Sequence, residues 1–263
     1  MQVMFYSPSG QKLFGDNGSP AFLLKGGIAD LKGAIEARTT VIPEVPGQIF
    51  DGITIKPFTF GVTMVVYPTE EMPMDKAMRK TRQIFSAFDY STCRIAGTGI
   101  PVGLKVRLES IIPAPSQDTA KGIAEEITIT LTADEGIFWT DQHENSGKTT
   151  IVNFGDCDLW PEYQWQKTAT ITLPSGAKIT LPETPTPRVL RTTRHQVSIT
   201  DLAGKPDREL LKKLGTIWPE GIPRKETKTY EITQHCSIKW RIGYLDPLGV
   251  VNGTIAVGTI RTA

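Results

Sequence analysis

The residues that could support covalent chemistry in this chain are three cysteines and three histidines, all widely separated. Cys93, Cys157 and Cys236 are too far apart for a CxxC redox pair or a zinc knuckle. The histidines are His143, His195 and His235. A nucleophile pair of Cys157 with His195 or His235 stays open, because catalytic groups assemble in space and not in sequence order. No local motif supports such a cysteine hydrolase, so the cysteines are interpreted as reduced structural residues.

Two glycine-containing stretches could bind phosphate, but neither has the full pattern. Residues 146–149, Ser-Gly-Lys-Thr, match the end of a P-loop, which holds phosphates with backbone amides and a lysine. The P-loop motif requires a glycine at position 142, where this chain has Gln142. It also requires a helix after the lysine, whereas residues 150–152 continue as a strand. The glycines of residues 97–103 have the wrong spacing for a dinucleotide. The sequence therefore predicts no nucleotide, no other cofactor and no metal.

Aromatic side chains beside acidic ones give a third candidate, a sugar-binding surface. Trp160, Tyr163 and Trp165 follow Asp156 and Asp158. Aromatic faces combined with carboxylates are suited to carbohydrate, so these three rings are the glycan-binding candidates of the chain. The competing interpretation is that they are buried strand residues, which is the usual situation of tryptophan. Sugar binding requires at least two of the rings exposed on one groove, whereas a scaffold requires buried rings.

Composition excludes several classes of protein. The 29 Lys and Arg residues nearly balance 28 Asp and Glu, for a net charge of +1, which is not the excess of a protein held by nucleic-acid phosphates. No apolar run approaches the ~20 residues of a membrane span, and no secretory signal opens the chain. The 24 glycines and 19 prolines favour many short elements joined by turns over a helical bundle.

Period-two alternation of apolar and polar residues dominates the chain and predicts strands. It runs through residues 104–108 and 126–131, and through 169–181, where Gly176 supplies the turn of a hairpin. From 230 to 244 the apolar residues fall on one parity, which indicates one long strand or two strands meeting at a bend.

Two helices are predicted between these strands. Over residues 75–88 an apolar stripe at spacings of three and four faces inward and ends with Phe85 and Phe88. A shorter helix is expected from an N-cap at Asp207 to a terminating Gly215. The expected fold is mainly β: an N-terminal β-sandwich domain with one covering helix (1–140) and a second β domain (141–263), separated at a polar stretch.

Particular turns and their order carry a resemblance to a known family. In the first half, residues 46–52 form a glycine-rich turn before the strand at 59–67, and residues 133–139 form an acidic and then aromatic close. These features resemble the first domain of distal tail proteins from siphophages, the phages with long non-contractile tails. The versions from phages of actinobacteria, often labelled minor tail proteins, are the most similar.

The second half resembles the galectin-like β-sandwich domain of the same family. Its opening is Asn153-Phe154-Gly155-Asp156 followed by the aromatic residues 160–165. The hairpin, the helix at 210–214, a Pro-Glu-Gly turn at 219–221 and the strand to 244 follow in the family's order. The resemblance covers roughly residues 45–245, and the residues after Asp246, with an expected hairpin around Asn252, lie beyond it.

The resemblance implies a structural protein of the virion tail tip and not an enzyme. In this family the first domain joins copies of itself into a ring, usually of six, which caps the tail tube and seats the tip or baseplate proteins. The galectin-like domain points outward and supports host adsorption. The protein is then made in the host cytoplasm and needs no nucleic acid contact, membrane or cofactor. The alternative function is a carbohydrate-binding module that recognises host cell-wall glycans.

A rotationally symmetric ring requires two different complementary faces on each subunit. Exposed strand edges provide such faces by adding strands across a boundary. The strand at residues 2–6 and the loop at residues 30–45 are the segments expected to be exchanged between subunits.

Overall fold

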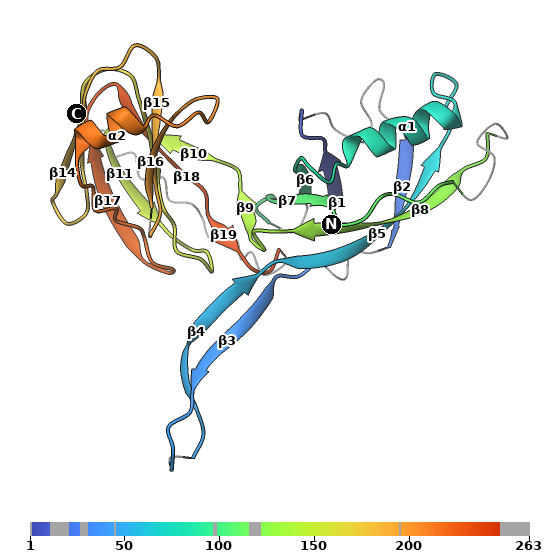
Figure 1. Cartoon of the computed structure of the whole chain (residues 1–263), viewed down its shortest axis with the longest axis horizontal. Helices are drawn as coiled ribbons and strands as arrows, with labels where there is room; N and C mark the ends of the chain where they lie inside the picture. Colours follow the sequence, from blue (N-terminus) through green and yellow to red (C-terminus); the bar gives the residue numbers. More distant parts are fainter. Residues whose placement is uncertain are drawn as a thin grey trace. The chain divides into compact units, whose positions relative to one another are not determined.

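The chain folds into two compact units that are mainly β (Figure 1). The computed structural model describes residues 2–10, 21–26, 31–44, 46–96, 99–115, 122–194 and 196–247, and two α-helices lie within these ranges. The predicted mainly β fold class is therefore confirmed. One unit contains Met1–Trp139 and the stretch that begins at Leu245, and the other contains Thr140–Tyr244.

The start of the stretch after Tyr244 packs with the first unit, whereas the sequence placed all of 141–263 in the second domain. The amide of Gly33 donates a hydrogen bond to the carbonyl of Leu245 at 3.1 Å. A Cβ at Gly33 would lie 2.7 Å from that oxygen, so the two backbones approach too closely for a side chain at this position. Within the described residues, the chain therefore passes between the units after Trp139 and again after Tyr244.

The first unit is built on one antiparallel sheet in two halves. The order is β1-β6-β7-β8-β5-β2, and β7 and β8 pair over only two residues, Arg107 with Thr132 and Leu108 with Leu131. Every second residue of β5 is buried, as period two demands, and α1 packs against this strand (Figure 1). The elements are β1 (Gln2–Tyr6), β2 (Ala21–Gly26), β3 (Ala34–Thr40), β4 (Ile49–Lys56), β5 (Phe58–Tyr67), α1 (Met74–Ile84), β6 (Ser91–Ala96), β7 (Val102–Leu108), β8 (Glu125–Ala133) and β9 (Phe138–Thr140).

Helix α1 ends earlier than its sequence pattern predicts. Its buried face carries Met74, Ala77, Met78, Thr81 and Ile84, as the stripe indicated. Phe85 is already extended, with φ −99° and ψ 119°. Phe88, expected on the buried stripe, is 95% exposed. The Oγ of Ser86 accepts hydrogen bonds from the amides of Phe88 and Asp89 at 3.0 and 3.1 Å, and this local turn replaces another helical turn.

The second unit is a sandwich of two antiparallel sheets, with orders β10-β18-β12-β15-β16 and β11-β17-β13-β14. Tyr163 of β12 and Tyr230 of β17 meet between them, with ring centroids 6.4 Å apart. The elements are β10 (His143–Asn145), β11 (Lys148–Val152), β12 (Glu162–Trp165), β13 (Ala169–Thr172), β14 (Lys178–Leu181), β15 (Arg188–Thr192), β16 (Val197–Asp201), α2 (Arg208–Leu214), β17 (Thr227–Ile232), β18 (Cys236–Trp240) and β19 (Gly243–Tyr244).

Several local predictions for this unit are confirmed. The hairpin β13–β14 turns at Gly176, which has φ +89°. Helix α2 is capped by Asp207, whose carboxylate accepts from the amide of Leu210 at 3.1 Å, and Gly215 ends it with φ +72°. The long alternating segment after Tyr230 is divided by a turn at His235, which has φ +70°, so the bent alternative is correct.

Asn153, the first residue of the Asn-x-Gly-Asp stretch, organises the start of this sandwich. Its side chain is fully buried and donates hydrogen bonds of 2.9 Å to the carbonyls of Cys157 and Ile222. Its Oδ1 accepts from the amide of Gly155 at 3.1 Å. A Cβ at Gly155 would lie 2.4 Å from the carbonyl oxygen of Gly243, so only glycine fits there. The motif is therefore architectural: an amide side chain and a close backbone approach hold three loops together.

We expect Asn153→Ala to destabilise the second unit by about 2–4 kcal/mol, because three hydrogen bonds worth ~1 kcal/mol each are lost and buried carbonyls remain unpaired. Chemical denaturation followed by tryptophan fluorescence measures this. Asn145→Ala is the matched control, since Asn145 bonds only the exposed amide of the neighbouring Ser146 among the described contacts. It should change the unfolding free energy by less than ~0.5 kcal/mol. Equal effects of the two substitutions would contradict the architectural role of Asn153.

Candidate assembly surface

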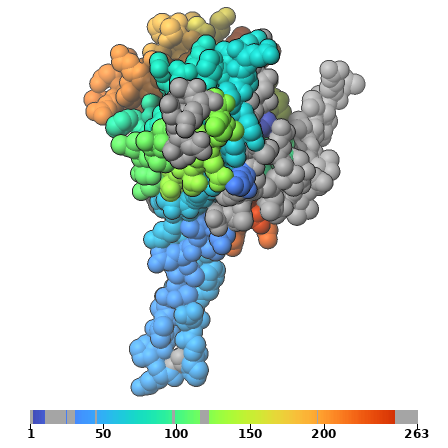
Figure 2. All heavy atoms as spheres, turned by 90° about the vertical axis from the view of Figure 1, so that its right-hand side faces the viewer, coloured from blue at the N-terminus to red at the C-terminus, as the bar shows by residue number. Residues whose placement is uncertain are grey.

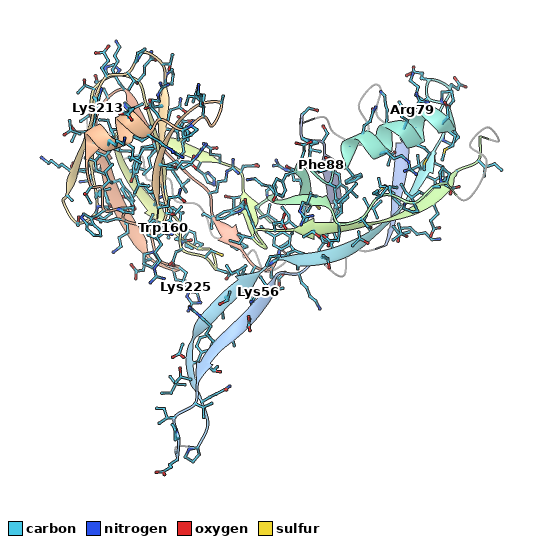
Figure 3. All side chains as sticks on the ribbon, in the orientation of Figure 1. Lys56, Arg79, Phe88, Trp160, Lys213 and Lys225 are labelled. Carbon is cyan, nitrogen blue, oxygen red and sulfur yellow. The ribbon has the colours of Figure 1, made fainter. Side chains whose placement is uncertain are left out.

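The three aromatic rings predicted to bind glycans do not form a shared surface. Tyr163 and Trp165 are each 1% exposed, on the inner face of their sheet. The Trp165 Nε1 donates to the Pro182 carbonyl at 2.9 Å, which satisfies its polar atom internally. Trp160 is half-buried, with its ring against the backbone of Gly221 (Figure 3). The predicted groove of at least two exposed rings is therefore corrected: period-two alternation turns Tyr163 and Trp165 into the core.

The three cysteines are buried, and burial raises the pKa of each thiol. Burial raises the pKa of the Cys93 thiol to about 12 and that of Cys236 to about 12. Burial, followed by the charges of Asp156 and Asp158, raises the pKa of Cys157 to about 11. The thiolate is the nucleophilic form, so these shifts oppose a cysteine hydrolase. His195 lies outside the described residues, and His235 sits at an exposed turn.

We expect none of the three thiols to react appreciably with a thiol-specific reagent at pH 8 in the folded protein. A thiol with pKa about 11 is ionised to roughly one part in a thousand at that pH. All three should react in urea. Counting modified cysteines by mass spectrometry checks this, with the urea-unfolded chain as the control. Rapid labelling of Cys157 in the native protein would reopen the catalytic interpretation.

The other predicted chemical motifs are parts of strands. Residues 148–152 form β11, and Gly147, with φ +75°, lies in the turn by which the chain passes from β10 in one sheet to β11 in the other, so no helix follows the P-loop-like residues. Within the described ranges, no group of three or more His, Cys, Asp or Glu side chains is placed to hold a metal ion. In that part of the chain, neither helix is long and apolar enough to cross a membrane.

An exposed apolar surface of the first unit lies on a two-stranded arm formed by β3 and β4. The sequence predicted a loop at 30–45, whereas residues 34–40 pair with 49–56. Ile35 lies opposite Ile55, and Ala37 lies opposite Ile53, so these four side chains share one face. Figure 2 shows the arm extending from the body of the unit, and Ile35 is 57% exposed.

The opposite face of the arm is polar. Glu36 lies opposite Thr54 and forms an ion pair with Lys56 at 2.6 Å, and this pairing lowers the pKa of Glu36. The hydroxyl of Thr40 donates to the carboxylate of Asp51. A sheet face that is apolar on one side and polar on the other normally packs its apolar side against another layer.

The outer end of the arm adds a cluster of apolar side chains beyond a register irregularity after Arg38. Thr39 is opposite Phe50, which joins the apolar face and is 61% exposed. The exposed apolar residues of this end are Val41, Ile42, Ile49 and Phe50. An apolar surface of this kind on a protein unit marks an interaction site.

A second exposed apolar surface lies where α1 ends. The amide of Leu108 donates to the carbonyl of Ser86 at 2.9 Å, and Arg82 Nη1 donates to the carbonyl of Ile112 at 2.9 Å. These bonds hold the loops 86–90 and 109–113 side by side. Phe88 of the first loop is 95% exposed and Ile111 of the second is 89% exposed. Phe88 lies at the end of α1 in Figure 3.

An ion-pair cluster fixes the far end of the loop that carries Phe88. Arg107 binds both carboxylate oxygens of Asp134, at 2.7 and 3.1 Å, and the hydroxyl of Tyr90 donates to the same carboxylate at 2.8 Å. The Arg107 and then the Tyr90 hydrogen bonds lower the pKa of Asp134. The loop 86–90 is therefore held at both ends, by Ser86 and by Tyr90, and presents Phe88 between them.

Because the folded pKa of Asp134 lies below its unfolded value, ionised Asp134 stabilises the fold at neutral pH. That contribution is lost as the pH falls below about 4 through the lowered pKa. We expect Asp134→Asn to lower the urea midpoint at pH 7, with the difference from the natural protein shrinking below pH ~4. Glu71→Gln, at an exposed carboxylate of the same unit, is the control. A difference that is independent of pH would show that ionisation of Asp134 is not responsible.

The chain has a mainly β fold of two units, and it returns to its first unit after Tyr244. Two solved structures share it over nearly their whole length. The SPP1 Dit protein (gp 19.1), described as a paradigm of the hub adsorption apparatus of phages that infect Gram-positive bacteria, is similar with TM-score 0.55 and 13% identity, covering 93% of this chain and 100% of that chain.

A chain of the phage P2 baseplate in its activated conformation with Ca is similar with TM-score 0.51 and 9% identity, covering 92% of this chain and 98% of that chain. No protein-family model matches the chain, and no curated protein matches it in sequence. The chain thus has the fold of phage distal tail proteins of the siphophage type, and the resemblance seen in the sequence is confirmed at the level of fold.

Proposed function

We propose that this chain is a structural component of a phage tail tip, in which copies of the chain form a ring. The expected number of copies is six. The ring joins the tail tube to the tip or baseplate proteins and supports host adsorption, with the virion tail as its location. The observation that carries the proposal is the likeness to the SPP1 Dit hub protein over 93% of this chain and 100% of that chain.

The arm is the element proposed to join neighbouring copies. A ring contact is heterologous, so each copy must offer one surface and accept it with a different one. The arm offers an apolar face that its own unit leaves exposed, and burying a large apolar side chain contributes about 1.5–3 kcal/mol. Of the two segments expected to be exchanged, 30–45 contributes to this arm. The other, β1, is paired with β6 of its own chain through residues 2–6.

The second unit is proposed to be the galectin-like domain that faces outward and carries adsorption proteins. Its two-sheet sandwich, of five and four strands, supports this assignment. A carbohydrate-binding module acting through Trp160, Tyr163 and Trp165 is not proposed, because two of the three rings lie in the core.

Charged substitutions on the apolar face of the arm should prevent assembly. Ile35→Lys and Phe50→Lys place a charge on the apolar face and should convert rings to folded monomers, because the charge would be buried in the contact. Thr54→Lys is the matched control, since it adds the same charge to the polar face opposite Glu36. Mass photometry and negative-stain images of the full chain measure assembly, and circular dichroism confirms folding.

The outcomes separate clearly. Rings formed by the natural protein and by Thr54→Lys, but not by the two apolar-face variants, support the proposal. A natural protein that stays monomeric at high concentration and in the presence of purified tail tube protein would overturn it. If rings still form after both apolar-face substitutions, the arm is not part of the contact between copies.

A further inference from the structure

We propose that the surface receiving the arm is the outer face and C-terminal end of α1 in the neighbouring copy, centred on Phe88 and Ile111. The inference rests on the proposed ring and identifies its second contact surface. The arm needs a complementary apolar partner, and these two side chains are the most exposed large apolar residues of the first unit, at 95% and 89%.

Hydrogen bonds hold in place both loops that carry these side chains. Ile112, next to Ile111, is buried, and its carbonyl accepts from Arg82 of α1. Ser86 accepts the amide of Phe88 through its side chain and the amide of Leu108 through its carbonyl. Both exposed side chains therefore stand on loops that the helix and the sheet hold in place. A fixed surface loses little conformational entropy on binding.

Charge gives an independent reason to pair the two surfaces. In residues 38–52, the outer part of the arm, the acidic Glu44 and Asp51 outnumber the one basic residue, Arg38, and all three are exposed. In residues 75–89, which contain most of α1 and the loop after it, the basic Lys76, Arg79, Lys80 and Arg82 outnumber the acidic Asp75 and Asp89. Lys76 and Arg79 are exposed, and Arg79 projects from α1 in Figure 3.

The two surfaces thus match in both properties that decide a contact. An apolar and acidic arm end would meet an apolar and basic helix end, with the apolar residues buried at the centre and the charges at the rim. Both surfaces belong to the first unit and differ from each other, so the pairing can repeat head to tail from copy to copy, as the proposed ring requires.

Cysteine cross-linking tests the pairing directly, since the three native thiols are buried. Full-length Phe50→Cys is mixed with full-length Phe88→Cys or Ile111→Cys and exposed to a short bifunctional thiol reagent. Tyr67→Cys and Trp218→Cys are the control partners, because both positions are exposed aromatic residues outside α1 and the loops that carry Phe88 and Ile111. We expect cross-linked dimers with Phe88→Cys and Ile111→Cys, and background levels with the controls.

Charge reversal provides a second readout. Glu44→Lys combined with Asp51→Lys should raise the concentration needed for assembly by about tenfold, and Lys76→Glu with Arg79→Glu on the partner should restore it. Restoration supports the pairing, because a merely destabilised arm would not be rescued by changes on α1.

The failures are distinguishable. Rings that assemble while Phe50→Cys cross-links equally to all partners, or preferentially to Trp218→Cys, would overturn the inference and leave the proposed ring intact. Charge reversal without rescue would count against it in the same way. A natural protein that forms no oligomer at all, with or without tail tube protein, would instead refute the proposed function.

Discussion

An apolar strand face that stays partly exposed among the described residues is the feature on which the proposed assembly depends. A two-stranded sheet is at best marginally stable in water by itself. The arm nevertheless keeps Ile35, Ile53 and Ile55 on one side and a paired Glu36 and Lys56 on the other. Such separation of apolar and polar residues has no benefit for an arm surrounded by water on all sides. It becomes favourable when the apolar side is covered by another chain.

The root of the arm explains why it leaves the body of the unit. Pro57 separates β4 from β5 and has no N–H for a sheet ladder. From Phe58 onward the chain pairs with β8, whereas residues 49–56 pair with β3. Gly136 adopts φ +65° beside this junction, and a Cβ there would lie 2.4 Å from the carbonyl oxygen of Lys56. The close backbone approach fixes the direction in which the arm departs.

The sequence was sufficient where a short-range pattern decides the structure. Alternation predicted β7, β8 and the β13–β14 hairpin, and the cap at Asp207 predicted α2. It failed where two local preferences compete. The helical stripe continued through Phe88, but the Ser86 side chain takes the amides that a further turn would use. The arm was missed because the prolines and glycines of 43–52 indicate a loop, although Ile35, Ala37, Ile53 and Ile55 already carried the strand period.

The sequence left two interpretations of Trp160, Tyr163 and Trp165, a glycan-binding surface and buried strand residues, and parity bears on the choice between them. In β12, Tyr163 and Trp165 share one parity, and Glu162 and Gln164 share the other, so alternation alone places the two rings together on one face. The sequence does not state which face is covered. That depends on Tyr230 of β17, which packs against Tyr163 from the opposite sheet across about 70 residues of chain.

The same separation of properties has a consequence for the form of the assembly. In the proposed pairing, an arm and a helix end can meet reciprocally in a two-fold dimer or successively, head to tail, from copy to copy. Head-to-tail association closes into a ring only if the angle between the two surfaces matches the rotation of the ring. That angle is set at the root of the arm, by Pro57 and by the close approach of Gly136 to Lys56. We therefore expect a substitution at Gly136 to change whether the copies close into a ring or extend into an open filament. It would affect the contact surfaces themselves less.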